Sequence, residues 1–228
     1  MPSRTAPSLS NEEGEGRFSL SGLSPALFEV LSTAQRIGAI GPAPLEQHVR
    51  HAVGFAEALA PLIPETSRIV DLGSGGGIPG LVLAELFPRA SIVLLEGRTM
   101  RCELLEQSVE DLGLDQRVSV LASRAELVGR MARWRSSFDA AVARGFASPG
   151  VTAECAAPLL KTGGVLCVSE PPAAAAFERW PIESCAEVGL RPELALEVPR
   201  AFAVLRQVSP CPERYPRRVG VPAKRPLF

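Results

Sequence analysis

Short apolar runs alternate with stretches of helical periodicity through the middle of the chain. The apolar runs predict β-strands, and the stretches between them, where apolar residues recur every three or four positions, predict α-helices. The predicted strands are Ile69–Val70, Ser91–Glu96, Arg117–Ala122, Phe138–Ala143 and Val165–Val168. The predicted helices between them are Leu81–Phe87, Thr99–Leu112 and Pro149–Leu160. This alternation favours an α/β fold with a mostly parallel, doubly wound sheet that carries helices on both faces.

The N-terminal region predicts two helices before the first strand. Ser24 followed by Pro25 is typical of a helix start, because serine caps the first turn and proline fits the first helical position. A second helix is predicted over Leu45–Leu62, after a break at Gly38–Pro44. The residues before Gly22 are rich in Ser, Gly and Glu and predict a disordered start.

The C-terminal region predicts a further helix and a last pair of strands. Pro171–Ala186 favours a helix around Ala173–Trp180, and Leu194–Val198 and Ala201–Val208 favour an antiparallel strand pair. We therefore divide the chain into a disordered segment at 1–22, N-terminal helices at 23–66, an α/β domain at 67–209 and a basic tail at 210–228.

A glycine-rich loop directly follows the first predicted strand. The sequence of Arg68–Gly80 is R-I-V-D-L-G-S-G-G-G-I-P-G, and a helix is predicted to begin after it. Glycines in such a loop let a ligand approach the backbone, and the helix start adds N–H groups and a positive dipole end. Glu96 follows about twenty residues later, where a doubly wound fold binds a ribose. The order Asp-x-Gly-x-Gly-x-Gly looks like motif I of class I S-adenosylmethionine methyltransferases.

This loop has two other interpretations. A purely structural strand–helix turn needs no acid at Glu96, so the acid favours a ligand. A nicotinamide-dependent dehydrogenase fits less well, because its fingerprint is G-x-G-x-x-G and the spacing here differs.

Composition and charge place few limits on the function. The chain has 228 residues, 46% of them hydrophobic, and a net charge of −1, so any nucleic-acid surface has to be local. Its 5 cysteines are scattered and no run approaches the length of a membrane span, which favours a cytoplasmic protein with reduced thiols and no membrane contact. His48 and His51 are the 2 histidines, and without further soft ligands near them we expect no metal site.

Two short motifs near the predicted sheet have a local interpretation. Ser123–Glu126 has the S-x-x-E form of a capping box at a helix start, although the same place can also bind a ligand. Lys161–Gly164 predicts a turn into the fifth strand.

The tail is the one segment with a strong charge imbalance. Residues 211–228 carry five basic side chains against the single acid Glu213, a net charge of +4. A solvated tail explains this composition, and so does an arm that contacts RNA phosphates, with Tyr215 stacking on a base. Composition alone leaves both alternatives open.

Several motifs together resemble the RsmG (GidB) family. They are R-H (Arg50–His51), D-L-G-S-G-G-G-I-P-G (Asp71–Gly80), L-L-E (Leu94–Glu96), S-R-A-E (Ser123–Glu126), F-D-A-A-V-A-R-G-F-A (Phe138–Ala147), P-L-L-K-T-G-G (Pro158–Gly164) and Y-P-R-R-V-G-V-P-A-K-R-P-L (Tyr215–Leu227). The family methylates a guanine of small-subunit ribosomal RNA to 7-methylguanosine. The resemblance implies a Rossmann-like class I methyltransferase that uses S-adenosylmethionine and acts on 16S ribosomal RNA or the small ribosomal subunit.

The resemblance also assigns residues. It implies that the cofactor is bound by Asp71, Gly73, Ser74, Gly75, Gly77, Ile78, Glu96, Ala125, Glu126 and Arg144. It implies that RNA is bound by Arg50, His51, Arg217, Arg218 and Lys224. Arg144 and Arg101 are the candidate catalytic residues, since a guanidinium forks well onto guanine acceptors and phosphates.

The chain departs from the family pattern at a few positions. Met100, Ser169–Glu170 and Gly54–Phe55 replace the usual residues, and a positive charge is thereby exchanged for a negative one at Glu170. These departures keep two alternatives open. One is a diverged paralogue that methylates another RNA or a small molecule, and the other is a cofactor-binding protein without catalysis. We expect a monomer.

Overall fold

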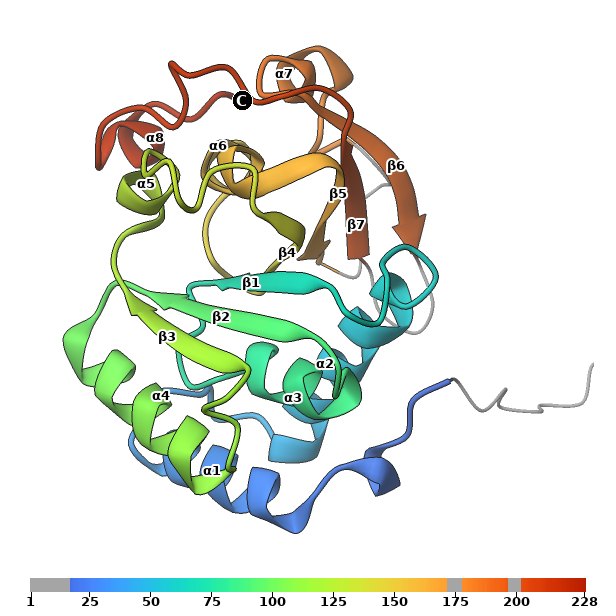
Figure 1. The fold of residues 1–228 in the computed structure, drawn as a ribbon, viewed down its shortest axis with the longest axis vertical. Helices are drawn as coiled ribbons and strands as arrows, with labels where there is room; N and C mark the ends of the chain where they lie inside the picture. Colours follow the sequence, from blue (N-terminus) through green and yellow to red (C-terminus); the bar gives the residue numbers. More distant parts are fainter. Residues whose placement is uncertain (1–16, 172–177, 197–201) are drawn as a thin grey trace, which may run out of the picture.

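The computed structural model describes residues 17–171, 178–196 and 202–228. Within them, one twisted sheet of 7 strands runs through the molecule in the order β3-β2-β1-β4-β5-β7-β6 (Figure 1). The strands are β1 (Arg68–Leu72), β2 (Ser91–Glu96), β3 (Val118–Ala122), β4 (Phe138–Ala143), β5 (Leu160–Ser169), β6 (Leu190–Leu196) and β7 (Phe202–Gln207). Strands β1 to β5 are parallel, and β7 pairs antiparallel with both β5 and β6. The expectation of a mostly parallel sheet with a final antiparallel strand is confirmed.

Helices cover both faces of this sheet (Figure 1). They are α1 (Pro25–Arg36), α2 (Leu45–Leu59), α3 (Gly80–Leu86), α4 (Thr99–Asp111), α5 (Ala125–Val128), α6 (Pro149–Ala156), α7 (Ile182–Ala186) and α8 (Val221–Lys224), with short 3₁₀ turns at Leu20–Gly22 and Ala157–Leu159. Helix α1 begins as its sequence predicts, since the Ser24 side chain accepts a hydrogen bond from Leu27 N and Pro25 follows. No helix among the described residues is long and apolar enough to cross a membrane.

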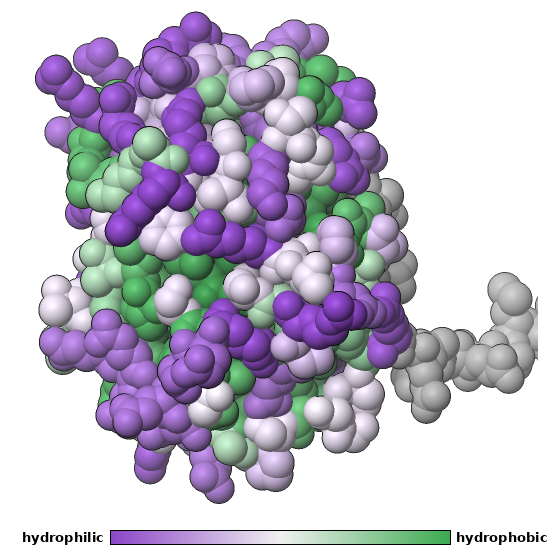
Figure 2. All heavy atoms as spheres, viewed as in Figure 1, coloured by the Kyte–Doolittle hydropathy of each residue, from purple (hydrophilic) through white to green (hydrophobic). Residues whose placement is uncertain are grey.

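Each face of the sheet has its own hydrophobic core. Alternate strand residues point to opposite faces, so Ile69 packs with α1 to α4 while its neighbour Val70 packs with α5 to α7. The N-terminal helices therefore belong to the same folded unit as the sheet. Figure 2 shows hydrophilic side chains over α4 and over the C-terminal residues, with hydrophobic atoms visible in the band between them.

Two local expectations were wrong. Lys161–Gly164 is the start of β5 and not a turn. A Cβ on Gly164 would lie 3.1 Å from the carbonyl oxygen of Asp139, so the glycine permits close approach of β4 at a register shift. Ser123 does not cap α5, whose N-cap residue is Arg124. The carboxylate of Glu126 instead accepts a hydrogen bond from Gly220 N at 3.1 Å.

The expected helix around Ala173–Trp180, within Pro171–Ala186, falls mostly outside the described residues. Only Ile182–Ala186 forms a helix among its described residues, and 172–177 lie outside the described residues. Residues 17–22, which we assigned to the disordered start, contact the domain through Phe18, whose N–H donates to Glu57 and whose ring packs on Phe87. Residues 1–16 lie outside the described residues.

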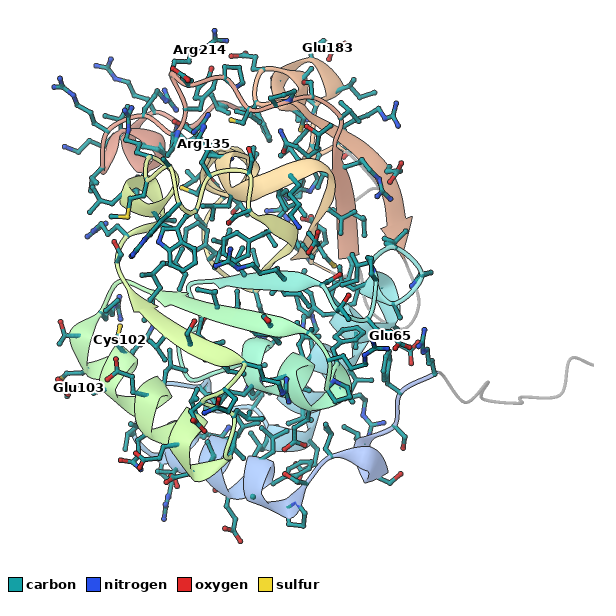
Figure 3. All side chains as sticks on the ribbon, viewed as in Figure 1. Glu65, Cys102, Glu103, Arg135, Glu183 and Arg214 are labelled. Carbon is teal, nitrogen blue, oxygen red and sulfur yellow. The ribbon has the colours of Figure 1, made fainter. Side chains whose placement is uncertain are left out.

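The C-terminal residues 210–228, which we call the C-terminal segment, pack along α5, α6 and α7 (Figure 1). Arg135 lies beneath this segment (Figure 3) and donates to three of its carbonyl oxygens, those of Cys211, Pro212 and Tyr215. Arg217 forms an ion pair with Glu154, whose side chain is fully buried. The segment is folded onto the domain and is not a solvated tail, while its contact with RNA stays a prediction.

Candidate functional site

The glycine loop lies at the carboxyl end of β1. The N–H of Gly73 donates to Leu95 O at 2.8 Å, which ties the loop to β2. Gly73 has a φ of +69°, and a Cβ there would lie 2.8 Å from the ring of Phe146. A glycine is therefore required, because both the backbone conformation and the close ring exclude a side chain.

Asp71 is buried beneath the loop and holds its far end. Its Oδ2 accepts a hydrogen bond from Gly80 N at 2.9 Å, at the first residue of α3. Its Oδ1 has no hydrogen-bond partner among the described residues. Burial raises the pKa of the Asp71 carboxyl to about 7, against the lowering effect of the bond from Gly80. The residue shapes the loop and does not line the cavity described below.

Glu96 ends β2 with its carboxylate facing the loop. Its Oε2 accepts from Gly75 N at 3.0 Å, and its Oε1 accepts from Gly97 N at 2.8 Å and Arg98 N at 2.9 Å. Arg101 adds a cation, with its guanidinium 3.9 Å from Oε2. These contacts fix the carboxylate at the wall of a cavity while leaving acceptor lone pairs, since each oxygen can accept more than one hydrogen bond.

A cavity of about 430 Å³ opens at the carboxyl ends of the central strands. Parallel α/β sheets bind their ligands at this edge. Its walls come from the glycine loop, the end of β2, the start of α5 and the residues after β4. The residues that line it include Gly73, Glu96, Arg101, Ala125, Glu126, Gly145 and Phe146, together with Ala223 of α8.

The structure brings only part of the predicted cofactor set to this cavity. Gly73, Glu96, Ala125 and Glu126 line it, as does the candidate catalytic Arg101. The remaining predicted residues are outside its lining, and they are Asp71, Ser74, Gly75, Gly77, Ile78 and Arg144. Ser74 is buried and donates to the Asp71 carbonyl, while Ile78 belongs to the core under α3 and α4. For these two the structure shows a role in the shape of the loop.

Arg144 follows β4 and contacts a histidine that sequence analysis did not assign to the site. Its guanidinium donates to Nδ1 of His48, and Nε2 of His48 lies 3.0 Å from Gly41 O. Because a carbonyl oxygen only accepts, Nε2 carries the proton and Nδ1 is the acceptor. Burial and the Arg144 charge lower the pKa of His48, which favours this neutral form. The contact links α2 to the end of β4, and no sequence spacing predicts it.

The predicted RNA-binding residues are divided between surface and interior. Arg50 is exposed on α2, whereas the His51 ring packs on Phe55 and Phe202. A Cβ on Gly54 would lie 2.8 Å from the Phe202 ring, which explains why a small residue stands there.

The basic residues of the C-terminal segment are similarly divided. Arg218 and Lys224 are exposed, while Arg217 is bound to Glu154. Tyr215 is buried and donates to Glu187 Oε2 at 2.8 Å, so the idea that its ring stacks on a base was wrong.

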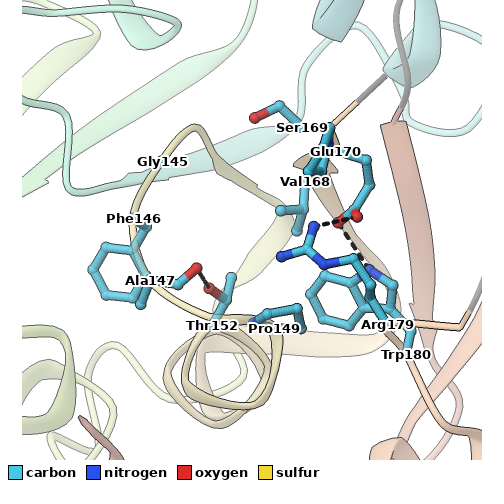
Figure 4. Close-up of a pocket in the computed structure, with 11 residues that line it drawn as sticks. Gly145, Phe146, Ala147, Pro149, Thr152, Val168, Ser169, Glu170, Arg179 and Trp180 are labelled. Atoms are coloured by element: carbon cyan, nitrogen blue, oxygen red, sulfur yellow. Dashed lines mark hydrogen bonds and ion pairs between the residues drawn. The ribbon is translucent and has the colours of Figure 1, made fainter. Parts of the chain in front are cut away.

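A second cavity of about 270 Å³ lies beyond Gly145 and Phe146, between the ends of β4 and β5 (Figure 4). Glu170 and Arg179 face each other at its wall in an ion pair. Glu170 stands as a negative charge at this position in the sequence, and the ion pair with Arg179 offsets that charge. Arg179 stands nine residues further along the chain, so no motif could have identified it.

The first cavity fits S-adenosylmethionine, the cofactor that the resemblance implies. The Glu96 carboxylate can accept hydrogen bonds from a ribose hydroxyl pair, and the glycine at position 73 leaves the backbone accessible. Ala125 and Val151 supply apolar wall for a purine. Among the described residues, no group of three His, Cys, Asp or Glu side chains is placed to hold a metal ion.

Comparison with protein families identifies the chain. Residues 28–170 match the model of the GidB family, described as rRNA small subunit methyltransferase G. The chain is 40% identical over 172 residues to the ribosomal RNA small subunit methyltransferase G of Rubrobacter xylanophilus, covering 70% of this chain and 65% of that protein. The enzyme of the same name from Dictyoglomus thermophilum is 34% identical over 76% of each chain. The chain thus spans just under two thirds of the Rubrobacter relative and about three quarters of the Dictyoglomus one.

Solved structures agree on the fold. A SAM-dependent O-methyltransferase from Thermotoga maritima aligns with a TM-score of 0.58 at 19% identity, covering 82% of this chain and 73% of that one. A cofactor-bound protein from MTB aligns with a TM-score of 0.59 at 19% identity, over 84% and 93% of the two chains. The sheet order, the glycine loop and the family match lead to one conclusion: the chain belongs to the rRNA small subunit methyltransferase G (GidB) family.

Proposed function

We propose that this protein is an S-adenosylmethionine-dependent methyltransferase that forms 7-methylguanosine in 16S ribosomal RNA of the small subunit. The observation that carries the proposal is the cavity at the end of β2, where the Glu96 carboxylate faces the glycine loop. Family membership supplies the RNA substrate. We further propose that it acts as a single chain in the cytoplasm, where small subunits are assembled.

The proposed reaction needs no proton transfer by the protein before the methyl group is transferred. S-adenosylmethionine supplies a methyl group that is already activated by a sulfonium, and guanine N7 carries a lone pair at neutral pH. The protein therefore has to align the two reactants and exclude water, which is catalysis by proximity and orientation. Glu96 would hold the ribose hydroxyls, and Gly73 would let the backbone approach the cofactor. Arg101 would offset the charge of Glu96 at the same wall.

Arg144 would bind the target base or an adjoining phosphate near the reaction centre. Its guanidinium is oriented by His48, which in turn is held by the Gly41 carbonyl. We therefore regard His48 as a positioning residue. Arg218, Lys224 and Arg50 are exposed and would contact RNA phosphates.

The test is methyl transfer to small ribosomal subunits that lack this modification. Purified protein is incubated with radiolabelled S-adenosylmethionine and the subunits, and the labelled nucleoside is identified by mass spectrometry. The expected product is 7-methylguanosine at one position of 16S RNA. A different labelled nucleoside would indicate a diverged paralogue, and cofactor binding without any label would indicate a binding protein; either result would contradict the proposal.

A further inference from the structure

The second cavity adjoins the cofactor cavity closely enough to serve the same reaction. Gly145 and Phe146 line both cavities, so the two cavities share a wall. Both cavities lie at the carboxyl edge of the sheet, and the second is bounded by the end of β5 through Val168 and Ser169. If the first cavity holds the cofactor, the second is the neighbouring space for the group that accepts the methyl.

The polar wall of this second cavity is a three-residue arrangement. The Arg179 guanidinium donates to Glu170 Oε2, and Trp180 Nε1 donates to Glu170 Oε1 at 3.0 Å (Figure 4). Trp180 is buried, and the Glu170 side chain is only 8% exposed. The Arg179 side chain is 38% exposed, and its guanidinium points into the cavity (Figure 4). A buried carboxylate, itself held by a buried indole, thus orients an accessible arginine.

In this arrangement the Arg179 guanidinium presents hydrogen-bond donors to a ligand in the cavity. A guanidinium has five N–H groups and no acceptor, and the bond to Glu170 uses only part of them. We propose that Arg179 binds the O6 carbonyl of the target guanine, and that Glu170 and Trp180 are positioning residues for it. The inference rests on the proposed function and adds the means by which the base is recognised.

The acceptor pattern of guanine fits such a site. Guanine carries an acceptor at O6, whereas adenine carries an amino donor at the same place. A guanidinium beside that position therefore favours guanine and leaves adenine with two opposed donors, which is costly in a partly enclosed site.

The Glu170 carboxylate offsets the positive charge of Arg179, which alone would oppose the reaction. Transfer of the methyl to N7 forms the N7–C bond, breaks the S–C bond, and leaves the positive charge on the purine and a neutral thioether. A cation beside O6 would oppose this change. Because Glu170 is paired with Arg179, the pair has no net charge and supplies directed N–H donors without a net cation.

The first experiment compares Arg179→Gln with Arg191→Gln in methylation of small ribosomal subunits. Arg191 is an exposed cation on β6 and serves as the matched control for loss of one charge. We expect kcat/KM for subunits to fall about 10- to 100-fold in Arg179→Gln, the loss associated with a charged hydrogen bond, and to stay within about twofold in Arg191→Gln. Cofactor affinity measured by calorimetry should be unchanged in both. If Arg179→Gln and Arg191→Gln methylate subunits equally well, the inference is overturned. It is also overturned if cofactor affinity in Arg179→Gln falls as much as kcat/KM does.

The second experiment separates the base from the phosphate as the group that Arg179 binds. GMP, guanosine and AMP are compared as inhibitors of methylation by the wild-type protein. If Arg179 binds O6, GMP and guanosine inhibit more strongly than AMP, and Arg179→Gln and Glu170→Gln remove this preference without changing cofactor affinity, measured at a temperature at which circular dichroism shows each variant folded. GMP and AMP inhibiting alike, with guanosine weaker, would assign Arg179 to phosphate and overturn the proposal. Equal inhibition of the wild-type protein by GMP, guanosine and AMP would also overturn the proposal.

Failure of the proposed function and failure of the assignment of Arg179 give different results. If the wild-type protein forms no 7-methylguanosine, the proposed function is wrong. If it does so and the Arg179 and Glu170 variants behave like the control, only the assignment of the second cavity is wrong.

Discussion

The glycine loop and the C-terminal segment both line the same cavity, yet only the loop could be interpreted from its sequence. In the loop, Asp71 binds Gly80 nine positions away, and the glycines form a recognisable motif, although Gly73 also contacts Leu95 and Phe146. The C-terminal segment is fixed by partners far away in the chain, such as Glu154, which is separated from Arg217 by 63 residues. The loop therefore carries a local motif that can be recognised in the sequence, whereas the segment depends on tertiary contacts that composition does not show.

The difference matters for function because the segment lines the cavity proposed to bind the cofactor. Gly220 N donates to Glu126, and Ala223 lines the cofactor cavity. Composition allows a solvated tail or an arm on RNA, and neither alternative predicts a place for the segment at the cavity wall. The structure instead predicts that removal of the segment would open the cavity wall and expose the buried carboxylate of Glu154.

The largest expected effect comes from breaking the ion pair that anchors the segment. Arg217→Ala leaves the fully buried Glu154 carboxylate without its partner, which should lower the free energy of unfolding by about 3–5 kcal/mol. The measurement is urea denaturation followed by circular dichroism. Arg218→Ala is the control, since this exposed side chain should change stability by no more than about 0.5 kcal/mol. Equal effects of the two substitutions would mean that the segment is not anchored as described.

A second prediction concerns pH and the glycine loop. The buried Asp71 carboxyl has a pKa of about 7 in the folded protein, above its ordinary value of 3.8. Between these values the unfolded chain releases a proton that the folded chain keeps, so stability falls as the pH rises from about 4 to about 7, by up to about 4 kcal/mol.

Asp71→Asn removes the titrating group and keeps an acceptor for Gly80 N. We expect its free energy of unfolding to be nearly flat over the same pH range, measured against wild type at pH 4.5 and pH 7.5 by urea denaturation. A variant with the same pH dependence as the wild-type protein would refute the assignment to Asp71.

The third prediction sharpens the role of the cofactor cavity. Glu96→Ala removes the carboxylate proposed to hold the ribose and should weaken S-adenosylmethionine binding about 10- to 100-fold in calorimetry. Glu103→Ala on the exposed side of α4 is the matched control and should bind normally. Normal binding by Glu96→Ala would place the cofactor elsewhere.

A smaller effect is expected at the contact between α2 and β4. His48→Phe keeps a ring of similar size but removes the acceptor for Arg144 and the donor to Gly41. We expect kcat/KM for small subunits to fall about tenfold with unchanged cofactor affinity. His48→Gln, which can still accept from Arg144, should recover part of the loss. An equal loss of kcat/KM in both variants would mean that His48 acts through packing and not through its bond to Arg144.

The smallest expected effect tests the exposed part of the C-terminal segment. Lys224→Gln should leave stability and cofactor binding unchanged and should reduce the slope of log affinity against log salt for RNA binding by about one. The slope is obtained from binding to small-subunit RNA at several salt concentrations. An unchanged slope would remove Lys224 from the RNA surface.

Much of the fold could be predicted from the local pattern of apolar residues. Several contacts at the candidate site could not be predicted in this way. Apolar runs such as Ser91–Glu96 and Phe138–Ala143 coincide with β2 and β4 residue for residue, because a strand buried on both faces needs continuous apolar sequence. The His48–Arg144 contact spans 96 positions. Glu126 also had a plausible local explanation as a capping residue, and only the folded C-terminal segment shows its actual partner.

The most direct test of the central claim is made in cells. The gene for this protein is deleted from its host, and 16S ribosomal RNA is analysed by mass spectrometry with and without complementation by the wild-type chain or Glu96→Ala. We predict that one 7-methylguanosine disappears on deletion, returns with the wild-type chain and does not return with Glu96→Ala. An unchanged 7-methylguanosine content after deletion would contradict the account.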